Sequence, residues 1–207
     1  MGALLEDFPL FPLPIVLLPT EVVPLHIFEE RYKIMIGNCL EENEEFGVIW
    51  LSDDGLKEVG CTAQVADVLE RADDGRMNIL VQGAIPFRLL ERVEDQAYPA
   101  GVVELLDDRN EEMDEKVSGD AREGFASLVE RVTDQRPEEG ALAELDSYSM
   151  AASVDMGADA KQGLLELRSE QARLRLLSRL FKAAMERLDV ADKIAEQARG
   201  NGKVRFS

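Results

Sequence analysis

The sequence predicts an α+β protein, in which a β-barrel with one early helix precedes a bundle of helices. Prolines break the apolar opening segment, alternating apolar residues follow as far as about residue 106, and helical spacing dominates from there to about 190. We therefore expect a β-barrel subdomain over residues 1–106, a helical subdomain over 107–190 and a frayed tail over 191–207.

The opening segment is apolar and unusually rich in proline. Proline has no backbone N–H, so it neither donates to a β-ladder nor fits inside a helix. We expect short extended pieces broken by turns, with prolines at sheet edges or strand ends: Pro9, Pro12, Pro14, Pro19 and Pro24. The spacing then turns helical, because Phe28, Tyr32 and Met35 fall on one helix face, and a helix is expected over residues 28–45.

The next part of the chain has the pattern of strands. The turn Asp73-Asp74-Gly75 is typical of a hairpin, and a change of phase near Ala66 indicates a bulge. The expected strands are 46–51, 59–71, a pair within 76–95 kinked at Gly83-Ala84, and 100–106. Together with the opening pieces they suit a closed or partly closed barrel.

Three helices are expected after the acidic stretch 107–116. One covers 112–135, a second covers about 139–154, and the last covers 159–188 with a continuous apolar stripe. The carboxylates between Glu104 and Glu115 lack the spacing of a calcium loop, so we interpret them as a solvated linker and expect no metal.

Composition narrows the possible partners. The net charge is −19, which disfavours nucleic acid, because its phosphates would repel the protein. No apolar run reaches the roughly 18 residues of a membrane span, and the opening segment lacks the basic start of a signal peptide. Cys39 and Cys61 are too few for a disulfide framework. We expect a cytoplasmic protein that binds neither nucleic acid nor membrane.

Three stretches carry a resemblance to a known family. They are Pro-Leu-His-Ile-Phe-Glu at 24–29, the G-x-x-A-x-V pattern at 60–65, and Lys-Gln-Gly-Leu-Leu-Glu at 161–166. The chain resembles the Lon substrate-binding family, the N-terminal domain of Lon proteases, from about Phe8 to Leu188. The resemblance implies a PUA-like pseudo-barrel followed by a helical bundle. It also implies binding of unfolded or exposed-hydrophobic polypeptide segments.

The sequence departs from full-length Lon in one respect. It contains no G-x-x-x-x-G-K-[ST] motif, so it offers no phosphate-binding loop for ATP, and no segment remains for a serine–lysine protease domain. We expect a free-standing, non-catalytic binding module without a cofactor, which neither hydrolyses ATP nor cleaves peptides.

Candidate peptide-binding residues are the aromatic and methionine side chains that are not clearly core: Phe28, Tyr32, Trp50, Met150 and Met156. Phe28 and Tyr32 share a helix face, and the favoured alternative is that they pin that helix to the barrel. Trp50 ends a strand just before an acidic turn. We expect these residues to border an apolar groove between the barrel and the helices, and backbone pairing at a barrel edge is a further mode of binding.

Two other functions stay open. The chain could be an assembly or regulatory protein that self-associates, or docks on a protease, through its helical domain; a partly exposed apolar stripe over 164–188 would favour this. It could also be a small hydrolase, which would require His26, the only histidine, to be exposed in a cleft beside a carboxylate.

Overall fold

A computed structural model describes residues 2–93 and 96–201. The chain divides into two compact units, of which the first comprises Met1–Asn110 and Asp146–Glu170, and the second Glu111–Leu145 and Gln171–Ser207. The expected helical subdomain over 107–190 is therefore split, since Asp146–Glu170 belongs with the β unit.

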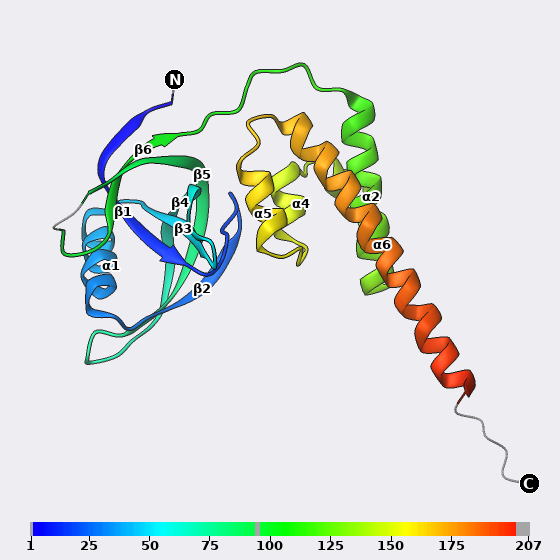
Figure 1. Cartoon of the computed structure of the whole chain (residues 1–207), viewed down its shortest axis with the longest axis horizontal. Coiled ribbons are helices and arrows are strands. Elements are labelled where there is room, and N and C mark those ends of the chain that lie inside the picture. The colour runs from blue at the N-terminus through cyan, green and yellow to red at the C-terminus, as the bar shows by residue number, and fades with distance from the viewer. Residues whose placement is uncertain (1, 94–95, 202–207) are drawn as a thin grey trace, which may run out of the picture. The chain divides into compact units, whose positions relative to one another are not determined.

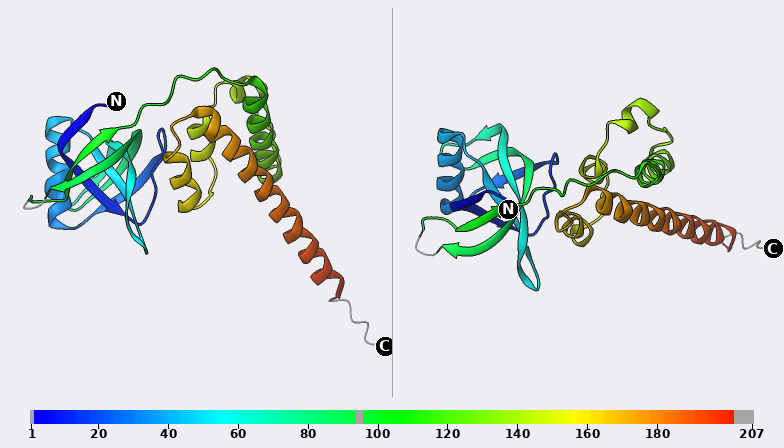
Figure 2. Two further views of the ribbon diagram at one scale, coloured as in Figure 1. Left: turned by 45° about the horizontal axis from the view of Figure 1, so that its top comes forward. Right: turned by 90° about the horizontal axis from the view of Figure 1, so that it is seen from above.

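The first unit is a mixed β-barrel (Figures 1 and 2). The strand order is β2-β5-β4-β3-β1-β6, and a further pairing of β5 with β6 closes β1, β3, β4, β5 and β6 into a ring. Strand β2 lies outside this ring and pairs with β5. The strands are β1 Leu4–Leu13, β2 Val22–Ile27, β3 Phe46–Ser52, β4 Gly55–Arg71, β5 Met77–Val93 and β6 Ala100–Leu105.

Strand β1 is longer than the sequence predicted, although it contains two prolines. Its first part, Leu4–Pro9, pairs with β6, and its second part, Leu10–Leu13, pairs with β3. The strand thus changes partners next to Pro9, and Pro12 lies where only one side is paired, so a missing N–H costs little.

Strand β5 runs unbroken over the region where the sequence predicted two strands joined or kinked at Gly83-Ala84. The register against β4 shifts between Cys61 and Ala63, which absorbs the bend near Gly83. Before the bend β5 lies between β2 and β4, and after it β5 pairs with β6.

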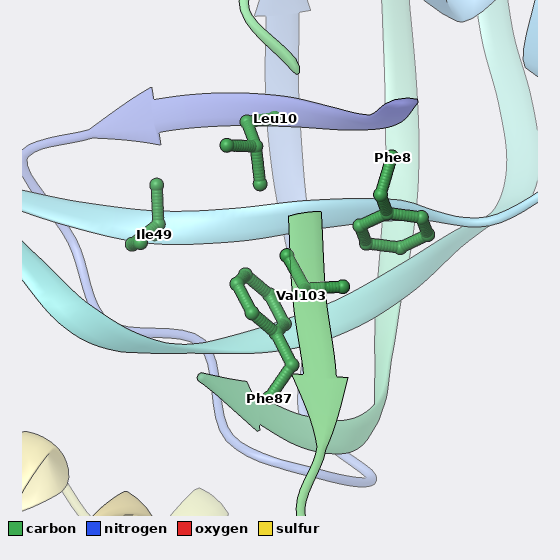
Figure 3. Packing of buried hydrophobic residues seen from close by; sticks show 5 residues of the cluster. All are labelled: Phe8, Leu10, Ile49, Phe87 and Val103. Carbon is green, nitrogen blue, oxygen red and sulfur yellow. The ribbon is translucent and has the colours of Figure 1, made fainter. Parts of the chain in front are cut away.

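The barrel interior is filled by side chains from four strands. Phe8 and Phe87 meet edge to face, with ring centroids 5.9 Å apart. The same cluster, drawn in Figure 3, contains Leu10, Ile49 and Val103. Each fully buried side chain of this kind stabilises the fold by about 1.5–3 kcal/mol.

Helix α1 runs over Glu30–Glu42, shorter than the expected 28–45. Tyr32 packs on Phe11 of β1, with ring centroids 4.2 Å apart. The helix ends at Asn43, whose φ of 55° is the left-handed conformation typical of a helix C-terminus.

The helices expected at 139–154 and 159–188 are each broken in two. The first becomes α3, Glu139–Ala143, and α4, Ser147–Ala152; the second becomes α5, Ala158–Leu165, and α6, Glu170–Asn201. Helices α4 and α5 belong to the first unit. Two side chains anchor α5 there, because Lys161 forms an ion pair with Glu21 and the Gln162 amide donates to the Val59 carbonyl at 3.1 Å.

The second unit is helical. Helix α2, Glu115–Thr133, packs on α6 through Phe125 and Phe181, whose ring centroids lie 5.8 Å apart. Arg131 pairs with Asp192, and α6 runs as far as Asn201, so residues 191–201 are helical in this structure where the sequence predicted a frayed tail. Residues 202–207 lie outside the described part of the chain.

Candidate functional site

The hairpin of β4 and β5 extends beyond the ring and carries β2 on its side. Strand β3 pairs with β4 only as far as Ala63, so residues 64–71 pair with β5 alone and are mostly exposed. The register forms two rows across the three strands: Pro24 opposite Leu80 opposite Asp67, and His26 opposite Asn78 opposite Glu70. Cross-strand partners project from the same face of a sheet, so these side chains share one face.

Two shallow hollows meet on this sheet. The smaller, about 170 Å³, is lined by His26, Glu70, Ala72, Arg76, Met77 and Asn78. The larger, about 460 Å³, is lined by Pro24, Leu25, His26, Leu69, Glu70, Asn78 and Ile79. We call the region formed by Pro24, His26, Phe28, Leu69, Glu70 and Asn78 the His26 surface.

A chain of hydrogen bonds fixes the polar groups of the His26 surface. The His26 Nδ1 atom lies 2.6 Å from Asn78 Oδ1, and the Asn78 Nδ2 group donates to Glu70 Oε2 at 2.8 Å. An amide oxygen can only accept, so Nδ1 carries a proton and donates it. In the neutral imidazole this leaves Nε2 as an acceptor for a ligand N–H or O–H group.

Two large apolar side chains flank these polar groups. Phe28 is 58% exposed and stacks on the His26 ring, with centroids 5.8 Å apart and ring planes 21° from parallel. Leu69 is 56% exposed and lines the larger hollow. Exposed apolar groups beside fixed polar groups are typical of a binding surface.

The charge of the surface is negative. Asp67 and Glu70 are exposed and form no ion pair within the described residues. The nearest basic lining residue, Arg76, is paired with Asp74 at 2.7 Å, and its backbone amide and guanidinium hold the pKa of Asp74 below its usual range. The surface therefore favours a ligand with positive charge.

Of the five predicted site residues, only Phe28 borders the His26 surface. Tyr32 is buried against Phe11, and burial raises its pKa. Met150 has no exposed area, so it cannot contact a peptide in this structure. Trp50 is half-buried beneath the Lys57 ammonium, 5.4 Å from its ring, and Met156 is half-buried between α4 and α5.

Sequence reasoning missed Pro24, Leu69, Glu70 and Asn78 as site residues. The adjacent apolar pair Val68-Leu69, which breaks the alternation beside the Asp-Asp-Gly turn, was the one available signal. Pro24 and Asn78 depend on the register between β2 and β5, which joins residues at least 50 positions apart, and Glu70 depends on the register between β4 and β5.

The hydrolase hypothesis required His26 to be exposed near a carboxylate, and it is. However, Glu70 reaches His26 through the Asn78 amide and does not contact the imidazole ring. Neither hollow is lined by a serine, threonine or cysteine that His26 could activate.

The described residues also bear on metal and membrane binding. Within residues 2–93 and 96–201, no group of three His, Cys, Asp or Glu side chains is placed to hold a metal ion. In the same residues, no helix combines the length and the low polarity needed to cross a bilayer.

A β-barrel unit and a helical unit make up the described chain. The chain belongs to the family described as the ATP-dependent protease La (LON) substrate-binding domain, whose model matches residues 7–183. The family predicted from the sequence is therefore confirmed.

Two solved structures share the fold. One is a Lon N-terminal domain protein from Xanthomonas campestris, 24% identical, with a TM-score of 0.64 over 82% of this chain and 95% of that one. The other is the N-terminal domain of the Mycobacterium avium complex Lon protease, 17% identical, with a TM-score of 0.63 over 84% of this chain and 97% of that one. The α+β architecture predicted from the sequence is confirmed by these structures.

Proposed function

We propose that this chain is a non-catalytic module that binds unfolded or extended polypeptide segments through the His26 surface. The observation that carries the proposal is the pair of exposed apolar side chains, Phe28 and Leu69, beside the fixed His26–Asn78–Glu70 network. Membership of a substrate-binding domain family supports binding as the activity.

The composition of the surface suits a broad range of polypeptides. Phe28 offers a rigid ring that buries apolar area without a large loss of side-chain freedom. Unfolded chains expose apolar side chains and backbone amides together, and the surface offers apolar groups beside hydrogen-bond acceptors. A folded protein buries both kinds of group, so the surface distinguishes the two states.

The expected affinity is modest. Covering Phe28 and Leu69 contributes at most about 1.5–3 kcal/mol each, and association itself costs several kcal/mol. These two contacts alone do not offset that cost, so further contacts along the polypeptide must contribute and the affinity is expected to be no tighter than micromolar, about −8 kcal/mol.

The test is a titration of fluorescein-labelled, reduced and carboxamidomethylated lysozyme, followed by anisotropy. Labelled native lysozyme serves as the folded control. Phe28→Ala and Leu69→Ala should each weaken binding of the unfolded form about tenfold, equivalent to roughly 1.4 kcal/mol. Val132→Ala, at a residue that is 67% exposed on α2, should leave binding unchanged.

The proposal fails if the unfolded form does not saturate up to about 100 μM, or if it binds no better than the native form. It fails equally if Val132→Ala weakens binding as much as Phe28→Ala, because the apolar contact would then not be local to the His26 surface.

A second candidate is an assembly or regulatory protein that acts through its helices. The part of the apolar stripe that ends at Phe181 does not favour an assembly function, because Leu174, Leu177 and Phe181 are buried. Further along α6, however, Val190 and Ile194 are 55% and 61% exposed and lie one helical turn apart. This function would be supported if the mass of the native chain in sedimentation rises with concentration and the Ile194→Ser variant stays monomeric.

A further inference from the structure

We propose that the open edge of β2 pairs with an extended, positively charged segment of another polypeptide, which adds as a strand to the sheet. The inference rests on the proposed function and specifies how the polypeptide binds. It concerns the backbone of β2, whereas the proposed function rests on the side chains of the His26 surface.

Strand β2 has one paired side and one open side in the described structure. It pairs with β5 from Val22 to Ile27 and stands at the end of the strand order. In an antiparallel pair, backbone groups of alternate residues point toward the partner strand and away from it. The amide of Gly83 donates to the Glu21 carbonyl at 2.9 Å, so Glu21 faces β5.

This alternation then tells whether the backbone groups of each β2 residue face β5 or the open edge. Val23, Leu25 and Ile27 face β5, and Val22, Pro24 and His26 turn their backbone groups to the open edge. Pro24 agrees with this assignment, since a residue without an N–H belongs on the unpaired side of an edge strand. The edge thus offers N–H groups at Val22 and His26, and carbonyl groups at Val22, Pro24 and His26.

The occupant must supply main-chain hydrogen bonds in a matching row, which an extended polypeptide does. A second copy of β2 fits poorly, because an antiparallel pair centred on Pro24 would oppose two residues that lack N–H groups. A segment from another chain meets no such conflict.

Charge narrows the occupant further. Asp67 lies in the same cross-strand row as Pro24, and Glu70 in the same row as His26. Neither has a basic partner in the described residues, whereas Arg76 and Arg31 are neutralised by Asp74 and Glu29. The whole chain carries a net charge of −19, so a segment with lysine or arginine is favoured.

The first experiment is amide hydrogen exchange by NMR on the full chain, with a capped decapeptide of alternating valine and threonine and one lysine at each end. Saturation should slow exchange at Val22 and His26 at least tenfold. Val23 and Leu25, already bonded to β5, should change little. The same peptide with glutamate at each end should bind at least about threefold more weakly.

The second experiment removes single donors. Val22→Pro deletes an N–H on the open edge without touching the ladder to β5, and should weaken peptide binding several-fold. Val22→Thr keeps the N–H and is the matched control. Single N-methyl groups placed along the peptide should weaken binding at every second position.

Three results would overturn the inference. They are an absence of peptide binding, binding without slowed exchange at Val22 and His26, and equal losses at every N-methyl position. If unfolded lysozyme still binds in a manner that depends on Phe28, the proposed function stands and only strand addition is lost.

Discussion

Gly83 lies where β5 passes the loop before β2, and a Cβ atom built there would come within 2.2 Å of the Leu18 carbonyl oxygen. The backbone cannot retreat easily, because Gly83 bonds to both Thr20 and Glu21. A glycine in the middle of a strand normally weakens it, and here the close approach of two backbones explains its presence.

Gly83→Ala should therefore lower the free energy of unfolding by about 1–3 kcal/mol or more, as overpacking does. Gly37 in α1 is the control, since a Cβ there meets nothing within 4 Å and alanine favours a helix by up to about 1 kcal/mol. Urea denaturation measures both. An unchanged stability for Gly83→Ala would contradict the packing described.

The buried thiol of Cys39 makes the stability of the fold depend on pH. Burial, and then the carboxylates of Glu44 and Glu42, raise its pKa to about 11 from 9.0. The folded state holds this proton more tightly than the unfolded state, so the contribution to stability is complete below pH 9 and is lost as pH rises toward 11.

Between pH 9 and 10.5, Cys39→Ala should therefore lose less stability than the native chain, by about 1 kcal/mol. The comparison uses urea denaturation at matched ionic strength, and the difference cancels the effect of Tyr32, which titrates in both proteins. Parallel pH profiles for the two proteins would be the contrary result.

At the scale of elements, the strands and helices were predicted in kind but not in extent. The apolar spacing of residues 159–188 gave no sign of the break between α5 and α6. Leu164 and Leu165 of the first unit are buried, and so are Leu174 and Leu177 of the second unit at the same spacing. Periodicity reports that residues are buried, and it does not report against which partner.

One of the two contacts that anchor helix α5 is an ion pair. Glu21 is largely buried, accepts from the Leu18 amide at 3.0 Å and pairs with Lys161 of α5. Glu21→Ala leaves the ammonium without its partner and should destabilise the chain by up to about 3–5 kcal/mol.

Hydrogen exchange in Ala158–Leu165 should accelerate in Glu21→Ala. Arg76→Ala, which removes an exposed ion pair with Asp74, should cost at most about 1 kcal/mol and leave α5 unchanged. Equal effects of the two substitutions would show that Glu21 does not anchor the helix.

At the scale of the molecule, family and fold class could be predicted, because three local stretches carry the resemblance and the family match spans residues 7–183. The candidate site could not, apart from Phe28. It is assembled from β2, β4 and β5 by strand register, so Pro24 and Leu69 become neighbours only in the fold. The predicted turn at Asp73-Asp74-Gly75 constrains the register of β4 against β5, but no turn joins β2 to β5, so a local pattern does not fix that register.

The two units also set where binding is expected. The His26 surface lies wholly in the first unit, and the exposed residues of α6 lie wholly in the second. The binding function and the assembly function therefore predict contacts on different units, and a probe on each unit separates them.

The most direct measurement is photo-crosslinking on the full chain, with a benzophenone side chain at position 69 or, in a matched variant, at position 132. We expect an adduct with unfolded, carboxamidomethylated lysozyme from position 69, little from position 132, and none with native lysozyme. Adducts formed equally from both positions, or from position 132 alone, would contradict the claim that the His26 surface binds polypeptide.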